Sequence, residues 1–161
     1  MEYEENNMNQ IAQLLSADKQ LAIVLGGGII MAAKNGNNDA VQFRKKIATR
    51  KDIKINVPSI AFKEICKVGQ LSFDNAVSLI DSFSRNGQIE YFSCSDDGQI
   101  VLQAEVLRAK YTVYCHYPDD HYVVIAKEYS ALPVTFDKKL KDIARAEVVL
   151  TFCLWNFRFY N

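Results

Sequence analysis

The sequence predicts an α/β fold, a three-layer αβα sandwich with a central, mainly parallel sheet of about five strands. Two observations lead to this prediction. Short apolar or β-rich runs alternate with helical patterns along the chain, which is the order of successive β-α-β crossover units. The first run, LAIVL at residues 21–25, is apolar at every position, as is typical of a strand that helices cover on both faces.

The composition is that of one globular domain. The 161 residues are 49% hydrophobic and carry no formal net charge, so we expect an ordinary core and no global signature of nucleic-acid binding. We expect residues 1–19 to be a polar N-terminal extension and residues 20–161 to be a single domain. No apolar run approaches the roughly 18 residues of a membrane span, and the four cysteines form no C-x-x-C pair. The expected protein is cytoplasmic, with reduced thiols and no zinc site.

The elements follow from the local pattern. Five strands are expected, in chain order LAIVL (21–25), IKINVP (53–58), QIEYFSC (88–94), LPVTFD (132–137) and EVVLTF (147–152). Helices are expected over IIMAAK, NNDAVQFRKKIATRK, IAFKEICKVG, SFDNAVSLIDSFSRNG, QIVLQAEVLRAKY, PDDHYVVIAKEYSA and KKLKDIARA. Asn38 or Asp39 is expected to cap the second of these helices. Ser59 is expected to cap the third, and Gly69 to end it.

Acidic residues follow several of these strands. Glu64 lies about two turns into the helix after the second strand. Asp119 and Asp120 open a later helix, and Asp137 follows the fourth strand directly. Because parallel strands end at one edge of the sheet, these segments can converge there. Converging carboxylates repel one another, so a shared site needs a cation, and oxygen ligands suit Mg²⁺ or Mn²⁺. Such a site predicts metal-assisted phosphodiester hydrolysis, although helix capping alone also explains the aspartates.

Two segments resemble the PIN domain family. PDDHYVVIAKEYSALPVTFDKKL (118–140) is similar to the C-terminal half of these domains, with an aspartate at a helix start, an alanine-rich apolar helix and a strand ending in T-x-D. INVPSIAFKEI (55–65) resembles the second strand and the helix that carries a glutamate. The resemblance covers roughly residues 20–151. IVLGGGIIMAA falls where the first strand of the family ends in an aspartate, and that aspartate is replaced by Gly26.

The resemblance implies a divalent-metal-dependent endoribonuclease, the toxin component of a toxin–antitoxin system. RNA is then the substrate, and an antitoxin or a second copy of the chain is a partner. Glu64, Asp119 and Asp137 would hold Mg²⁺ or Mn²⁺ with Asp120 as a further ligand, and Thr135 would orient the catalytic site. Because Gly26 offers no side-chain ligand, we expect a weakened or inactive enzyme. The alternative is a catalytically degenerate PIN-like module that binds RNA or a protein partner.

Three explanations of Gly26-Gly27-Gly28 stay open: natural degeneracy, deliberate alteration, or compensation by Asp120 or another acid. A strand, glycines and a helix also outline a phosphate-binding turn, but the G-x-G-x-x-G pattern fails at Met31. The basic run RKKIATRKDIK (44–54) either contacts RNA or forms a solvated helix face. The aromatic C-terminus, FCLWNFRFYN (152–161), indicates either a partner surface or packing on the core.

Overall fold

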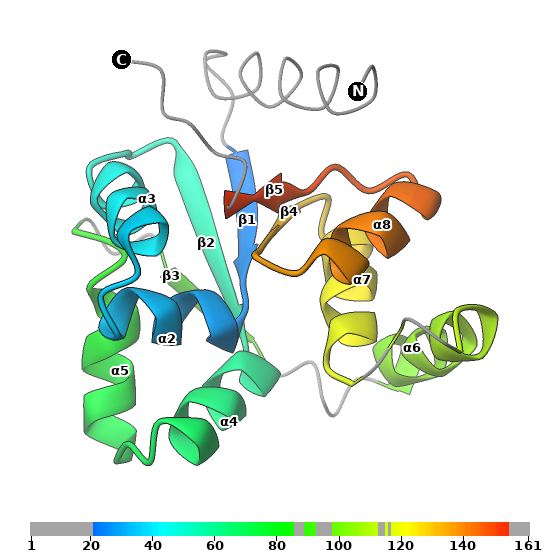
Figure 1. Ribbon diagram of the computed structural model, residues 1–161, viewed down its shortest axis with the longest axis horizontal. Helices are drawn as coiled ribbons and strands as arrows, with labels where there is room; N and C mark the ends of the chain where they lie inside the picture. The colour runs from blue at the N-terminus through cyan, green and yellow to red at the C-terminus, as the bar shows by residue number, and fades with distance from the viewer. Residues whose placement is uncertain (1–20, 86–88, 93–97, 113–114, 116, 155–161) are drawn as a thin grey trace.

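The computed structural model describes residues 21–85, 89–92, 98–112, 115 and 117–154 (Figure 1). The strands form one parallel sheet in the order β3-β2-β1-β4-β5. They are β1 (Leu21–Leu25), β2 (Ile53–Pro58), β3 (Ile89–Phe92), β4 (Leu132–Thr135) and β5 (Phe152–Cys153). The substantial part of the sheet has four strands rather than five, because β5 adds only 2 residues at its edge. The α/β class and the parallel sheet are confirmed.

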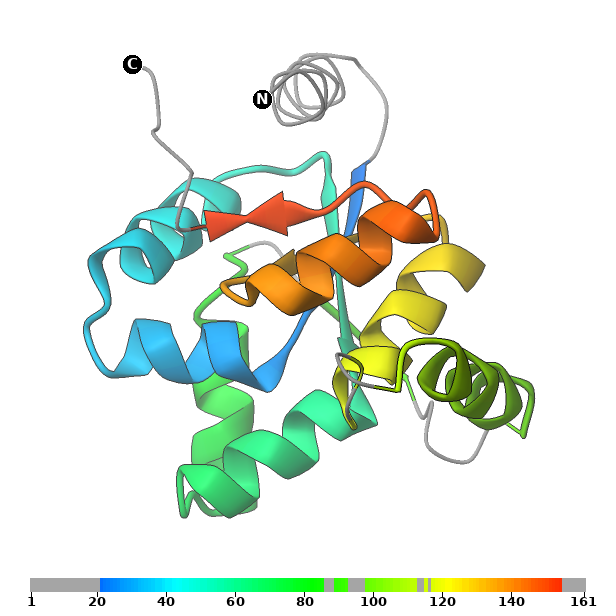
Figure 2. The ribbon, with the colours of Figure 1, turned by 45° about the vertical axis from the view of Figure 1, so that its right-hand side comes forward.

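Helices cover both faces of the sheet, as expected. They are α2 (Gly27–Lys34), α3 (Asn38–Ala48), α4 (Ser59–Val68), α5 (Phe73–Asp81), α6 (Gly98–Lys110), α7 (Asp119–Glu128) and α8 (Lys138–Ala146). Figure 1 shows α2, α3 and α5 on the left of β1, α4 below it, and α6 to α8 on its right. Helix α7 packs directly on β1 and β4. Helix α6 packs against α7, beside which it lies in both views (Figure 2).

Strand β1 is the centre of the core. Its residues Ile23, Val24 and Leu25 are at most 1% exposed. A strand buried on both faces must be apolar throughout, which is the pattern that LAIVL presents. β1 pairs with β2 on one side and with β4 on the other, and Leu25 lies opposite Val134 of β4. The carboxyl ends of β1 and β4 are therefore neighbours.

Two predicted helix caps are wrong. Asn37, not Asn38 or Asp39, caps α3, because its Oδ1 accepts a hydrogen bond from the backbone N–H of Ala40 at 3.1 Å. Ser59 is the first helical residue of α4, and the extended Pro58 before it occupies the N-cap position. Gly69 does end α4, as predicted.

The fifth strand is shorter than predicted and begins later. Residues 147–151 are not a strand, and Val148 is 90% exposed with a backbone φ of 60°. β4 has only 4 residues, so it can pair with few residues of a neighbour, and its register places Val134 opposite Phe152. The residues of EVVLTF favour a β-strand, but within the described part of the chain most of the segment has no neighbouring strand with which to pair.

Several predictions concern residues outside the described part of the chain. These are the N-terminal extension 1–19, the last two residues of the predicted helix SFDNAVSLIDSFSRNG, both ends of the predicted strand 88–94 and the aromatic residues from Trp155 onward. Within the described ranges, none of the helices has both the length and the apolar character that crossing a lipid bilayer requires. Cys66 and Cys115 form no disulfide.

Candidate functional site

A cavity of about 280 Å³ lies at the carboxyl ends of β1 and β4. The chain leaves these neighbouring strands in opposite directions, into α2 after β1 and toward α8 after β4 (Figure 1). Such a reversal leaves a crevice at the strand ends, which is where open α/β sheets bind their ligands. The cavity is therefore at the position in this fold where a functional site is expected.

Three of the predicted acids line this one cavity. Glu64 comes from α4, Asp119 is the first residue of α7, and Asp137 follows β4. Gly26 and Thr135 line the same cavity. Segments that lie far apart in the sequence thus bring three carboxylates and the glycine at the expected aspartate position to a common space.

The carboxylates do not form a preformed metal centre. Among the residues that the structure describes, no three histidine, cysteine, aspartate or glutamate side chains lie close enough together to hold a metal ion. A divalent cation at such a site takes several oxygen ligands at short distances. Among the described residues, these side chains as arranged therefore provide no preformed ligand set for the Mg²⁺ or Mn²⁺ that the sequence predicted.

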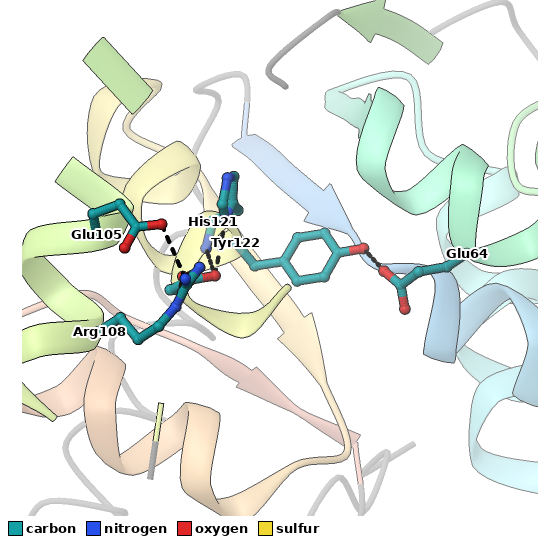
Figure 3. A network of polar contacts seen from close by, with 6 residues as sticks. Glu64, Glu105, Arg108, His121 and Tyr122 are labelled. Carbon is teal, nitrogen blue, oxygen red and sulfur yellow. Dashed lines mark hydrogen bonds and ion pairs between the residues drawn. The ribbon is translucent and has the colours of Figure 1, made fainter. Parts of the chain in front are cut away.

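Tyr122 is part of the reason why these carboxylates do not form a metal centre. It lies three residues after Asp119 on α7, so both side chains are on the same face of the helix. Its hydroxyl donates a hydrogen bond to Glu64 Oε1 and accepts one from the backbone N–H of Gly27 at 3.3 Å (Figure 3). Burial raises the pKa of the Glu64 carboxyl, and the hydrogen bonds from Tyr122 and Gly27 oppose that rise. Sequence reasoning missed Tyr122, although its helical spacing from Asp119 was a signal that could have found it.

The three glycines have three different environments. A Cβ atom at Gly26 would lie 3.3 Å from Cζ of Tyr122, so the tyrosine ring fills the space that a side chain at this position would enter. A Cβ atom at Gly27 would lie 2.7 Å from Cβ of Glu64 and 3.1 Å from the carbonyl oxygen of Ala61, so α2 and α4 approach too closely for a side chain. Gly28 faces open space. Only Gly27 is required to be glycine by its backbone neighbours.

Asp137 has a structural role whatever else it does. Its Oδ1 accepts a hydrogen bond from the backbone N–H of Lys139 at 2.7 Å, which caps α8. Its own backbone N–H donates to Thr135 Oγ1 at 2.9 Å. Thr135 therefore positions the Asp137 segment at the rim of the cavity. The capping interpretation of Asp137 and its position on the cavity are both correct descriptions of the same side chain.

Asp120 does not line the cavity. Its side chain is fully buried and accepts hydrogen bonds from Arg108 Nε at 2.9 Å and from the backbone N–H of His121 at 2.8 Å. His121 Nδ1 also lies 2.8 Å from Asp120 Oδ1 (Figure 3 shows the arginine and the histidine). Burial acts to raise the pKa of Asp120, but its hydrogen bonds to His121 and Arg108 prevail and lower it. The charge of Asp120 thus holds α6 to α7, and its geometry does not replace the missing acid at Gly26.

Comparisons with known proteins agree on the fold. No family model and no curated protein matches the sequence. Among solved structures, a chain of VapBC2 from Rickettsia felis bound to a promoter DNA fragment is similar with a TM-score of 0.56 and 19% identity, over 76% of this chain and 93% of that one. A chain of FitAcB from Neisseria gonorrhoeae is similar with a TM-score of 0.55 and 17% identity, over 84% of this chain and 99% of that one.

A third similar structure is FitAB bound to an IR36 DNA fragment, with a TM-score of 0.56 and 16% identity, over 86% of this chain and 99% of that one. These complexes are toxin–antitoxin complexes whose toxins are PIN domains. The likeness confirms the PIN-like fold that the sequence predicted. At less than 20% identity, a likeness of this kind concerns the fold alone.

Proposed function

We propose that this chain is a PIN-like component of a toxin–antitoxin type module, and that it binds an antitoxin-like protein partner without being an efficient nuclease. The proposal corresponds to the degenerate alternative raised by the sequence. The observation that carries it is Tyr122, whose ring lies against Gly26 and whose hydroxyl binds Glu64. An aromatic ring thus lies close against the position of the expected aspartate, and its hydroxyl binds one of the remaining acids.

Charge considerations support the same proposal. A carboxylate-only metal site gains its affinity from the number of acidic ligands that reach the ion. Here Gly26 contributes none, Asp120 is paired with Arg108, and Glu64 accepts a hydrogen bond from Tyr122. Efficient hydrolysis by a metal-bound water needs a firmly held ion. A chain with this set of side chains is therefore expected to bind Mg²⁺ or Mn²⁺ weakly.

The protein partner is supported by the similar structures. Chains of the same fold occur in the FitAB and VapBC2 complexes, which pair a toxin with an antitoxin. An exposed apolar surface is available for such contacts, because Leu102 and Val106 on α6 are 59% and 63% exposed one helical turn apart. Contiguous exposed apolar surface is a feature of protein interaction sites.

Two measurements test the proposal. The first is co-expression with the product of the reading frame next to the gene in its source locus, followed by size-exclusion chromatography. A stable complex that elutes as one species supports a toxin–antitoxin type module. The second is cleavage of a mixed RNA substrate with Mn²⁺ by the purified chain and by its Asp119→Asn variant. Equal background rates are expected, since the unsubstituted pocket is proposed not to catalyse.

A second candidate function is a weak Mg²⁺- or Mn²⁺-dependent endoribonuclease. It is favoured by one observation, that Glu64, Asp119 and Asp137 line a single cavity. In this case Lys138, Lys139 and Lys141, which follow Asp137 on α8, would attract the RNA backbone. Metal-dependent cleavage that Asp119→Asn abolishes would establish this second function and contradict the degenerate proposal.

A further inference from the structure

We infer that Tyr122 is the residue that keeps a divalent cation out of the acidic cavity, and that Gly26 and Tyr122 act as a pair in doing so. The inference rests on the proposed function and deepens it, because it assigns the low metal affinity to a specific contact. It also leads to a prediction that does not follow from the absence of the first aspartate or from the fold: an acid at position 26 is not sufficient to restore binding of a divalent cation.

The Tyr122 ring restricts the space for a side chain at position 26. A Cβ atom at Gly26 would lie 3.3 Å from Cζ and 3.4 Å from Cε2 of the Tyr122 ring. Contacts this short require the ring to give way by a few tenths of an ångström. The carboxylate of an aspartate extends beyond its Cβ atom, so it needs more of the same space. With Tyr122 in place, an aspartate at position 26 must therefore turn away from the cavity or displace the ring.

The Tyr122 hydroxyl donates to Glu64 Oε1 and accepts from the backbone N–H of Gly27. All three groups are buried or half-buried, and losing a buried hydrogen bond is costly. A metal ion that recruits Glu64 must compete with this bond. The phenol thus satisfies the glutamate in place of a cation and holds it on the α4 side of the cavity.

Asp119 and Asp137 also line the cavity, so two further carboxylates border the space beside the ring. Asp119 lies one helical turn before Tyr122, which means that the ring projects from the same face of α7 as this acid. Removing the ring therefore opens space beside three existing carboxylates rather than in an apolar part of the core.

The test is a double-mutant cycle of metal binding. Mn²⁺ binding is measured by isothermal titration calorimetry and by electron paramagnetic resonance for the wild type, Gly26→Asp, Tyr122→Val and the double variant. We expect little binding by the wild type and by Gly26→Asp. The double variant is expected to bind at least about tenfold more tightly than Gly26→Asp, because an added carboxylate raises affinity only where it can reach the ion. The gain should exceed the sum of the single effects.

Two controls make the result specific. Tyr129→Val, at the C-terminal end of the same helix, removes an exposed tyrosine outside the cavity and should leave Mn²⁺ binding unchanged. Tyr122→Phe removes only the hydroxyl, and it should improve Mn²⁺ binding over the wild type by less than Tyr122→Val does. Circular dichroism establishes that each variant is folded, and Tyr122→Phe tests the hydroxyl even where the valine variants do not fold.

The outcomes separate the inference from the proposed function. If Gly26→Asp alone binds Mn²⁺ as tightly as the double variant, Tyr122 excludes nothing and the inference is wrong. A folded double variant that binds no better than the wild type also overturns it. Tight Mn²⁺ binding with metal-dependent RNA cleavage by the unsubstituted chain would contradict the proposed function as well.

Discussion

The close approach of α2 and α4 at Gly27 gives a prediction whose size can be worked from the structure. The change is Gly27→Ala, and the matched control is Gly28→Ala in the next position of the same helix. An alanine Cβ at Gly27 would lie 2.7 Å from Glu64 Cβ and 3.1 Å from the Ala61 carbonyl oxygen, whereas at Gly28 it would meet nothing within 4 Å. The two substitutions therefore add the same methyl group, in a crowded position at Gly27 and in an open position at Gly28.

Replacing glycine by alanine within a helix favours folding by up to about 1 kcal/mol, so Gly28→Ala is expected to be neutral or stabilising. Gly27→Ala gains the same term but forces α2 and α4 apart, and overpacking of this kind costs about 1–3 kcal/mol. Relative to Gly28→Ala, which gains the same helix contribution, the expected loss is about 1–3 kcal/mol, which for a chain of this size lowers Tm by roughly 2–12 °C.

The assay is urea and thermal unfolding of both variants, followed by circular dichroism at 222 nm, a standard helix wavelength. Gly27→Ala should unfold at lower urea concentration than the wild type, and Gly28→Ala should not. If both variants unfold together at or above the wild-type midpoint, the close approach does not constrain Gly27. The reason given for one of the three glycines would then be wrong.

Three further predictions concern the polar contacts. Asp120→Asn is expected to lower the free energy of unfolding by about 1.5–3 kcal/mol, since it weakens the charged hydrogen bonds between a buried carboxylate and the partly exposed Arg108; a loss below about 0.5 kcal/mol in urea titrations would contradict this value. Glu147 accepts a hydrogen bond from Lys110, which lowers its pKa from the ordinary 4.5. A carboxyl whose pKa is lower in the folded state than in the unfolded state stabilises the fold at pH values above the unfolded-state pKa. That stability is lost as the pH falls through the folded-state pKa. Glu147→Gln should therefore lower Tm near neutral pH and have no effect on Tm in strong acid, and an equal loss at both pH values would refute the assignment. Asn37→Ala should cost about 1 kcal/mol, and Asn38→Ala much less, in the same unfolding assay.

The sequence was a good guide where a residue's surroundings are set by its own segment. The bounds of β2 follow from the alternating segment IKINV that Pro58 ends, and the start of α7 follows from its acidic first turn. The resemblance also located Glu64, Asp119 and Asp137, which line one cavity. These features depend on periodicity, capping and strand direction, and all three can be followed along a single chain.

Other features depend on which segments meet. The contact between Tyr122 and Gly26 requires the orientation of α7 against β1, and the constraint on Gly27 requires the distance between α2 and α4. Neither is encoded in a local pattern. The fifth strand was predicted too long for the same reason, since the length of β4 limits how much of the following segment can pair. Asp120 was assigned with the acidic ligands because its partner Arg108 could not be identified from spacing.

The central position of β1 has a consequence for shortened forms of the chain. One of its two neighbours, β2, follows closely, but the other, β4, starts only at Leu132. A fragment that stops before β4 leaves an apolar strand with one row of backbone groups unsatisfied, which is a template for self-association. During synthesis this edge of β1 stays unpaired until β4 has left the ribosome. Truncation products keep the same unpaired edge, so they are expected to aggregate rather than to fold as smaller domains.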